Sequence, residues 1–143
     1  MVTDPTDPKK HLPILFVDDD SIAHKVIDSH LEGWDVQHVY SAEKALELME
    51  KSDISIVITD IFMEDMDGIE LTKKIKKISS TIQVIIVTGA SDTINLINAL
   101  DVGANDFLIK PLQKEKLLEA LEIAEAKIKR WKNALKDLFK KRS

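Results

Sequence analysis

The sequence contains no cysteine, which excludes disulfide bonds and thiolate metal sites. It also has no long hydrophobic run, since no apolar stretch approaches the roughly 18 residues that are needed to cross a membrane. The first residues, MVTDPTDPKKHLP, lack the apolar segment of a secretory signal, so we expect a cytoplasmic location. With 44% hydrophobic and 31% charged residues, the composition is typical of a soluble globular protein.

The length of 143 residues fits one domain with its own hydrophobic core. Residues 1–11 are polar and contain two Asp-Pro steps, so we expect a flexible leader there.

Charge is unevenly distributed along the chain. Residues 127–143 hold eight Lys or Arg and one acid, a net charge of +7, which leaves −12 on residues 1–126 because the total is −5. Such a basic segment is typical of a solvated helix face or of a surface that binds acidic partners.

Five apolar runs alternate with stretches of helical periodicity. The runs ISIVIT (54–59) and IQVIIVT (82–88) are continuous and β-branched, which is typical of strands buried on both faces of a parallel sheet. The other three runs are residues 12–17, 34–40 and 106–110. The strict alternation predicts an α/β fold with a doubly wound, five-stranded parallel sheet and five helices, the last of them extended.

Helices are predicted over residues 21–31, 68–78 and 92–102, after a cap at Ser41, and from about residue 113 onward. The expected apolar faces are Ile22, Val26 and Ile27 in the first helix, Ala42, Ala45, Leu46 and Met49 in the second, Ile69, Leu71, Ile75 and Ile78 in the third, and Ile94, Ile97 and Leu100 in the fourth.

Polar residues follow four of the predicted strands, and ligand sites in such sheets lie at the carboxyl ends of the strands. These residues are Asp18, Asp19 and Asp20, then Asp60, then Thr88 and Gly89, and finally Lys110 and Pro111. Neighbouring carboxylates raise each other's pKa unless a cation intervenes, and Mg²⁺ prefers hard oxygen ligands. A carboxylate can also act as a nucleophile toward phosphorus. A single Asp after a strand is more commonly a helix cap. Because suitable polar residues follow four strands rather than one, we predict a site for Mg²⁺ and a phosphoryl group.

Four segments, ILFVDDDS, VITDIFMEDMDGIEL, VIIVTGAS and DFLIKPL, resemble in order and separation the receiver domain of two-component response regulators. The resemblance covers residues 12–126. It implies a flavodoxin-like fold with strand order 2-1-3-4-5, and a phosphorylation switch that takes its phosphoryl group from a histidine kinase or a histidine phosphotransfer protein. It also implies that the chain is not an enzyme beyond self-catalysed transfer to, and hydrolysis from, its own aspartate. A receiver that serves only as a binding or dimerisation scaffold is the alternative.

The resemblance implies a role for each site residue. Asp60 matches the phosphoacceptor and is also a Mg²⁺ ligand, Asp19 matches the direct Mg²⁺ ligand, and Asp18 matches the acid that holds metal-bound waters. The backbone carbonyl of Phe62 matches a further metal ligand. Asp20 is left with a lesser role at the start of the first helix.

The remaining matched residues concern the phosphoryl group and the switch. Thr88, Gly89 and Lys110 match the residues that contact the phosphoryl group, and Phe107 matches an aromatic switch residue coupled to Thr88. The Lys110-Pro111 bond matches a cis position. The segment MDG fits the turn that opens the third helix.

Two features depart from the family or vary within it. Glu64 stands where proline is common, which predicts a more mobile loop after Asp60 and an additional charge near the site. Ile61 and Ala90 occupy variable positions that flank the acceptor and are expected to influence the lifetime of the phosphoryl group.

The segment DDDSI also approximates the signature D-x-D-x-[TV] of haloacid-dehalogenase-type phosphatases, with Asp18 as nucleophile and Asp20 as general acid. Ile22 stands where that signature has Thr or Val. Asp60 would have no role in such an enzyme, so we prefer the receiver interpretation.

The last helix continues past the receiver with a heptad pattern of apolar residues. Its members are Leu117, Leu121, Ala124, Ile128, Trp131, Leu135 and Leu138. Packing on the sheet explains Leu118, Ile123 and possibly Leu117 more simply, so the seam proper is expected to begin near Ala124. The basic amphipathic extension, residues 127–143, could form a dimeric coiled coil, lead to an output domain, or fold back on its own domain. We favour dimerisation, and we expect no direct DNA binding because no DNA-binding module fits in this segment.

Overall fold

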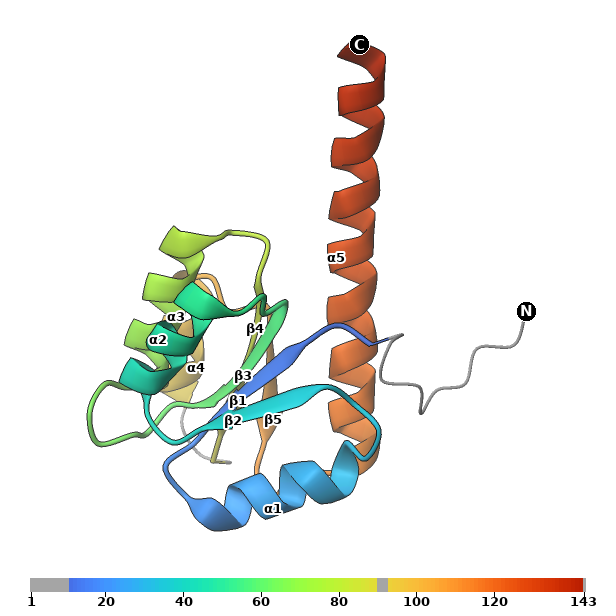
Figure 1. Ribbon diagram of the computed structural model, residues 1–143. Helices are drawn as coiled ribbons and strands as arrows, with labels where there is room; N and C mark the ends of the chain where they lie inside the picture. Colours follow the sequence, from blue (N-terminus) through green and yellow to red (C-terminus); the bar gives the residue numbers. More distant parts are fainter. Residues whose placement is uncertain (1–10, 90–92, 143) are drawn as a thin grey trace.

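The computed structural model describes residues 11–89 and 93–142, with only the backbone described at Thr93 and Arg142. Strands and helices alternate along this part of the chain, as Figure 1 shows. The elements are β1 (Ile14–Val17), α1 (Ser21–His30), β2 (Val36–Val39), α2 (Ala42–Lys51), β3 (Ile56–Asp60), α3 (Gly68–Ile78), β4 (Gln83–Thr88), α4 (Thr93–Asp101), β5 (Asp106–Ile109) and α5 (Lys114–Arg142). The predicted alternation is confirmed.

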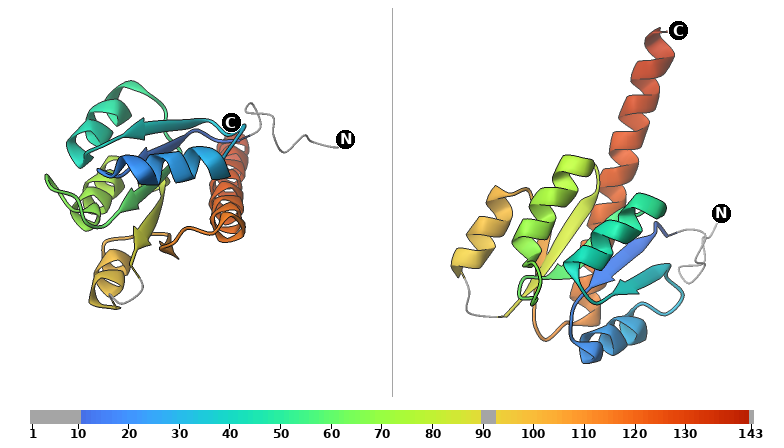
Figure 2. Two further views of the ribbon diagram at one scale, coloured as in Figure 1. Left: turned by 90° about the horizontal axis from the view of Figure 1, so that it is seen from below. Right: turned by 60° about the vertical axis from the view of Figure 1, so that its left-hand side comes forward.

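The strands form one parallel sheet in the order β2-β1-β3-β4-β5, which confirms the expected topology. Helices α1 and α5 cover one face of the sheet, and α2, α3 and α4 cover the other, as the two views of Figure 2 show. All five strands therefore point their carboxyl ends toward the same edge.

The sheet separates two apolar layers, and alternate residues of each inner strand feed them. In β1, Ile14 and Phe16 belong to the layer under α1 and α5, whereas Leu15 and Val17 belong to the layer under α2, α3 and α4. The side chains of β1 and β3 are buried along their whole length. These buried strands fix the position of the loops that follow them.

The structure corrects the predicted apolar face of α1. Ile22 is 66% exposed, whereas His24 and Ile27 are buried. His24, Ile27 and the following Leu31 are separated by three and four residues, so they share the side of the helix that faces the sheet. Ile22 lies two residues before His24 and points away from that side.

The apolar residues that were predicted to line α4 face solvent. Ile94, Ile97 and Leu100 are 72%, 53% and 70% exposed, and among the described side chains of this helix the buried one is Ala99. Ala99 packs in the same layer as β4, and its small side chain brings only a narrow side of α4 onto the sheet. Ile78, at the end of α3, is also exposed rather than buried.

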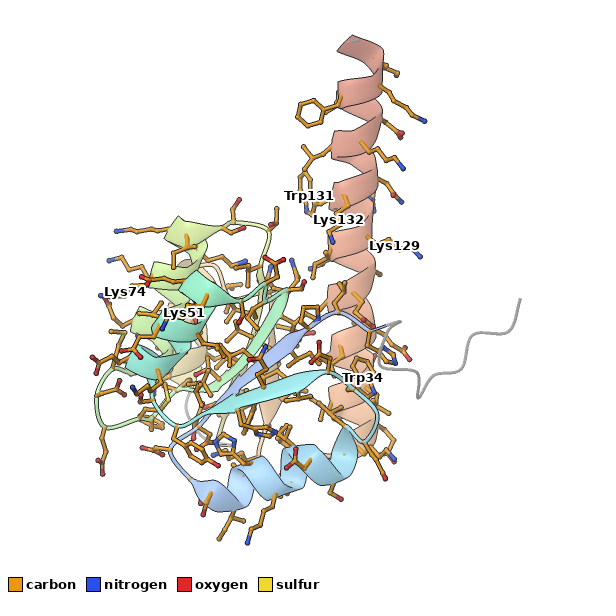
Figure 3. All side chains as sticks on the ribbon, in the orientation of Figure 1. Trp34, Lys51, Lys74, Lys129, Trp131 and Lys132 are labelled. Atoms are coloured by element: carbon orange, nitrogen blue, oxygen red, sulfur yellow. The ribbon has the colours of Figure 1, made fainter. Side chains whose placement is uncertain are left out.

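Helix α5 has two parts with different surroundings. The core residues of its first part are Leu117, Ala120, Leu121, Ala124 and Ile128. The expected packing of Ile123 on the sheet is wrong, because its side chain is 45% exposed. From residue 129 to 141 every side chain is exposed, and Figure 3 shows Trp131 on the part of α5 that stands clear of the sheet. The free part of the seam thus begins at Trp131 rather than near Ala124, because Ala124 and Ile128 belong to the core of their own domain.

Helix α5 continues without a break to Arg142, so within the described residues its extension does not fold back on the domain. No helix in residues 11–89 or 93–142 is long and apolar enough to cross a membrane. The predicted leader lies outside the described residues except for His11. That residue stacks on Trp34 at 3.5 Å between ring centroids and approaches Glu125 to 3.3 Å.

Candidate functional site

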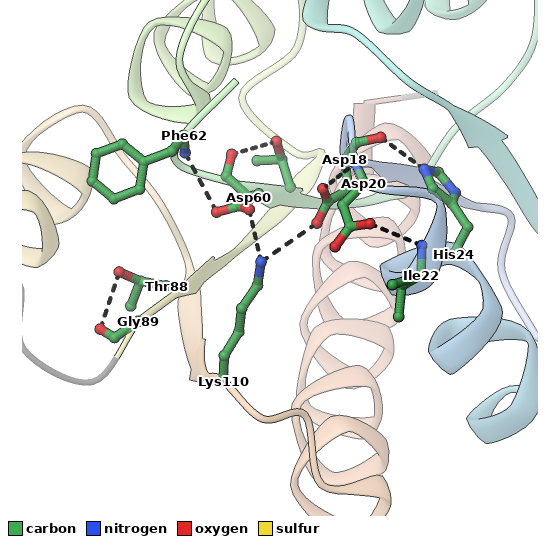
Figure 4. Close-up of polar contacts among 10 residues, drawn as sticks. Asp18, Asp20, Ile22, His24, Asp60, Phe62, Thr88, Gly89 and Lys110 are labelled. Carbon is green, nitrogen blue, oxygen red and sulfur yellow. Dashed lines mark hydrogen bonds and ion pairs between the residues drawn. The ribbon is translucent and has the colours of Figure 1, made fainter. Parts of the chain in front are cut away.

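Three charged side chains meet at the carboxyl edge of the sheet. Asp18 follows β1, Asp60 is the last residue of β3, and Lys110 follows β5. The Lys110 ammonium lies 2.8 Å from Asp60 Oδ2 and 3.7 Å from Asp18 Oδ2, as Figure 4 shows. Residues that lie 50 and 92 positions from Lys110 in the sequence are brought together here because β1, β3 and β5 end at one edge.

Asp18 is almost completely buried, with 1% of its surface exposed. Its Oδ1 accepts a hydrogen bond from the backbone N–H of Asp20 at 2.9 Å. Among the described residues its Oδ2 has no hydrogen-bond partner, and the Lys110 ammonium lies 3.7 Å from it. Asp20 instead accepts from the backbone N–H of Ile22 at 3.0 Å and caps α1, which confirms the expected position of this third aspartate.

The electrostatic state of the site follows from this burial. Burial raises the pKa of Asp18, and the charges of Asp60 and Asp19 add to the increase, while the Asp20 N–H and Lys110 oppose it. Partial burial by itself lowers the pKa of Lys110. The hydrogen bond and charge of Asp60, together with Asp18, outweigh that effect, so the pKa of Lys110 is raised. Lys110 is therefore held in its charged form, whereas burial disfavours the charged form of Asp18.

The residues present fit a hard cation in chemical type, because a buried carboxylate oxygen without a hydrogen-bond partner is the kind of ligand that Mg²⁺ takes. The Asp19 side chain, however, is exposed. Within the part of the chain that the structure describes, no group of three or more His, Asp or Glu side chains is arranged closely enough to hold a metal ion. The geometry thus brings Asp18 and Asp60 together around Lys110, and the ligand roles of Asp19 and of the Phe62 carbonyl stay predictions.

The Thr88 side chain makes no hydrogen bond to this cluster among the described residues, although its backbone does. Thr88 Oγ1 is buried and donates to the Gly89 carbonyl at 3.4 Å, whereas the Thr88 carbonyl accepts from the Lys110 backbone N–H at 2.8 Å. This backbone bond ties the ends of β4 and β5 together. Phe107 is 44% exposed. The Lys110-Pro111 peptide bond is cis, as expected.

Gly68 opens α3 directly beside the backbone of Asp60. Its N–H donates to the Ile61 carbonyl at 2.7 Å, and a Cβ at this position would collide with the Asp60 carbonyl oxygen. The glycine of the segment MDG is therefore required for steric reasons, because only a residue without a Cβ lets the start of α3 approach the backbone of Asp60 so closely. Asp67 caps the same helix by accepting from the Glu70 N–H at 2.8 Å.

The loop after Asp60 is tied to α2, which the sequence did not indicate. The Asp65 carboxylate accepts from the backbone N–H groups of Glu43 at 3.0 Å and Ala42 at 3.4 Å. Slight burial raises the pKa of Asp65, but these backbone hydrogen bonds outweigh it and lower the pKa. The neighbouring Glu64 is exposed, and Ile61 is buried. Ala90 lies outside the described residues.

Sequence reasoning also missed a histidine beside the site. His24 is buried, and its Nε2 lies 2.8 Å from the backbone carbonyl of Asp18 (Figure 4). The spacing of His24 to Ile27 and Leu31 places it on the buried side of α1 and could have identified it. The predicted apolar face did not include it because histidine is polar.

Known proteins are similar to this chain in sequence and in fold. The model of the response regulator receiver domain matches residues 14–122. The transcriptional regulatory protein ZraR of Salmonella typhimurium (strain LT2) is 38% identical over 117 residues, which cover 80% of this chain and 26% of that protein. The chain thus spans about a quarter of the length of this relative.

Solved structures show the same fold. A response regulator receiver domain protein (CheY-like) from Methanospirillum hungatei has a TM-score of 0.77 and 30% identity, over 85% of this chain and 99% of that one. NtrX from Brucella abortus, solved in complex with ADP, has a TM-score of 0.82 and 27% identity, over 90% of this chain and 30% of that one. The family model covers well over half of the sequence. The chain therefore belongs to the response regulator receiver domain family.

Proposed function

We propose that the chain accepts a phosphoryl group on Asp60 from a phosphohistidine of a sensor kinase or of a phosphotransfer protein. The observation that carries this proposal is the cluster of Asp18, Asp60 and Lys110 at the carboxyl ends of three strands. A carboxylate that is fixed beside an ammonium, with one oxygen within reach of solvent, is suited to attack phosphorus. Asp60 meets this description, because it is 8% exposed and lies 2.8 Å from Lys110.

In the proposed reaction an Asp60 oxygen forms a bond to phosphorus, and the bond between phosphorus and the histidine nitrogen breaks. The electron pair of the broken bond stays on the imidazole, which takes up a proton. Lys110 stabilises the negative charge of the transferring group. We assign further contacts with that group to the Thr88 hydroxyl and to Gly89. Hydrolysis returns Asp60 to its free form, so the chain acts on itself and not on a separate substrate.

We further propose that Asp18, Asp19, Asp60 and the Phe62 carbonyl hold Mg²⁺. The metal, when bound, would neutralise charge on the phosphoryl oxygens. Support comes from Asp18 Oδ2, which among the described residues has no hydrogen-bond partner and lies in a carboxyl group whose pKa is raised by burial.

The test is phosphorylation of the purified chain by acetyl phosphate and Mg²⁺, followed by intact-protein mass spectrometry. Asp60→Asn should abolish the gain of one phosphoryl group. Asp20→Asn should keep it, because asparagine can still cap α1. The haloacid-dehalogenase-type alternative, with Asp18 as nucleophile and Asp20 as acid, requires that Asp60→Asn remain labelled, and that outcome would refute our proposal.

For the output we propose a change in the surface made by α4, β5 and α5. Phe107, in β5, is the proposed switch residue, and the exposed Ile97 and Leu100 of α4 lie beside it around a common cavity of about 370 Å³. The extended α5 would pass this change on by pairing with a second copy of the chain. The role of ZraR in transcription is not transferred to this chain, since the match covers 26% of that protein.

A further inference from the structure

A row of hydrogen bonds leads from the surface of α1 to the backbone of the candidate site. Asp28 Oδ1 lies 2.7 Å from His38 Nε2, and His38 Nδ1 lies 2.7 Å from His24 Nδ1. His24 Nε2 then lies 2.8 Å from the carbonyl oxygen of Asp18. Two elements supply the row, since Asp28 and His24 belong to α1 and His38 belongs to β2.

The partners at the two ends fix where the hydrogens lie. A carbonyl oxygen only accepts, so His24 Nε2 is the donor toward Asp18. The Asp28 carboxylate also accepts, so His38 Nε2 is the donor toward it. One hydrogen must lie between the two Nδ1 atoms, because two lone pairs would repel each other at 2.7 Å. The hydrogen-bond row thus leaves the His24 Nε2–H directed at the Asp18 carbonyl oxygen.

The two rings are also held by packing. His24 is 4% exposed, with Phe16 edge-on at 4.8 Å and Tyr40 at 4.1 Å between ring centroids. Phe16 meets the His38 ring edge-on as well, at 6.2 Å. A histidine whose ring is fixed on several sides can hold its hydrogen-bond partner in one orientation.

The accepting carbonyl belongs to the peptide that joins Asp18 to Asp19. We propose that His24 is a positioning residue, which orients this peptide for cation binding and is itself aligned by His38 and Asp28. By fixing the Asp18 carbonyl, His24 sets the direction in which the Asp19 side chain leaves the backbone and keeps the Asp18 carboxylate beside Lys110. The inference rests on the proposed function, because it assigns His24 a role in the cation site of the receiver.

The test is the affinity of the full chain for Mn²⁺, measured by the electron paramagnetic resonance signal of the free ion, in the absence of any phosphoryl donor. His24→Leu removes the donor and should weaken Mn²⁺ binding about tenfold, the usual effect of losing a residue that orients metal ligands. His24→Gln keeps an N–H donor at the end of a side chain of similar length, and it should recover most of the affinity.

A matched control is His30→Leu. His30 lies in the same helix and donates from Nε2 to a backbone carbonyl, that of Leu112 at 3.1 Å, which is outside the Asp18–Asp19 peptide. This variant should bind Mn²⁺ as the unmodified chain does. Asp28→Ala, which removes the acceptor of the His38 N–H, provides a second variant for the case that His24→Leu does not fold, since Asp28 is 69% exposed at its side chain, and it should weaken Mn²⁺ binding in the same direction.

The inference is overturned if folded His24→Leu, or Asp28→Ala in its place, binds Mn²⁺ as tightly as the unmodified chain. It is also overturned if His30→Leu weakens binding equally, because the effect would then be a general loss of a histidine in α1. Labelling by acetyl phosphate separates this inference from the proposed function. If the unmodified chain is labelled on Asp60, the proposed function stands. If His24→Leu keeps its Mn²⁺ affinity in the same experiments, the positioning role of His24 is refuted.

Discussion

At the scale of single residues, Asp18 combines complete burial with an oxygen that has no hydrogen-bond partner among the described residues. We expect Asp18→Asn to raise the free energy of unfolding at neutral pH in metal-free buffer by about 1 kcal/mol, because it removes a buried and poorly compensated charge. Asparagine keeps the acceptor for the Asp20 N–H, so the turn before α1 should survive. Urea denaturation with a metal chelator present measures the change.

The sign of the expected change in the free energy of unfolding follows from the pKa of Asp18. The pKa of Asp18 is raised above its ordinary value of 3.8, so between that value and the folded-state pKa the folded chain binds more protons than the unfolded chain. Stability from this group is therefore present below pH 3.8 and is lost as the pH rises through the folded-state pKa. Asp18→Asn should lack this loss. A variant that is less stable than the unmodified chain at neutral pH would contradict the prediction.

Much of the site could be predicted residue by residue from the positions at which strands end. Asp18, Asp60 and Lys110 follow buried apolar runs, and the parallel sheet brings such ends to one edge. His24 and Asp65 could not be found in this way, since their roles depend on single hydrogen bonds to backbone groups of other elements. The spacing of apolar residues does not identify a polar residue that is buried together with its hydrogen-bond partners.

At the scale of secondary-structure elements, the close approach of α3 to β3 depends on Gly68. Gly68→Ala should lower the free energy of unfolding by about 1–3 kcal/mol, because its Cβ would meet backbone atoms of Asp60 and Ile61, which cannot move as a side chain could. It should also slow labelling of Asp60 by acetyl phosphate. Chemical denaturation and mass spectrometry measure the two effects.

The control for this substitution is Gly89→Ala, compared by denaturation alone. Among the described residues other than its chain neighbours, no heavy atom lies within 4 Å of a Cβ placed at Gly89. Gly89 also does not adopt a positive φ. Equal stability losses for the two variants would show that the contact of Gly68 with Asp60 is not the cause.

The helices show where sequence patterns succeed and where they fail. Helix α3 begins and ends as predicted, because Asp67 caps it and its apolar residues recur at helical spacing. The apolar side of α4 was assigned to the core, although Ile94, Ile97 and Leu100 face solvent. An amphipathic pattern identifies an apolar side but not what covers it, and among the described side chains of α4 only Ala99 belongs to the core.

At the scale of the whole molecule, the extension of α5 leaves Trp131, Leu135 and Leu138 exposed on one side of a basic helix. We expect this side to pair with a second copy of the chain as a parallel coiled coil. Sedimentation should then show a dimer at tens of micromolar protein, at least in the presence of beryllofluoride. A monomer both with and without beryllofluoride would contradict the prediction.

A pair of variants tests whether the apolar side causes the association. Leu135→Lys should shift the sedimentation coefficient to that of a monomer. Asn133→Lys adds the same charge on the opposite side of α5, where the side chain is also exposed, and it should leave the dimer intact. Dissociation by both variants would instead indicate charge repulsion between the basic helices.

The continuous length of α5 has a mechanical consequence. The helix begins four residues after Lys110, and past Ile128, the last residue anchored in the core, fourteen more residues of helix extend for about 21 Å at 1.5 Å per residue. No glycine or proline interrupts it. A rigid rod of this length is a lever, so a tilt of about 10° where it leaves the domain would displace its tip by about 4 Å, from the helical rise. Small rearrangements around Lys110 would thus be magnified at the far end of the chain.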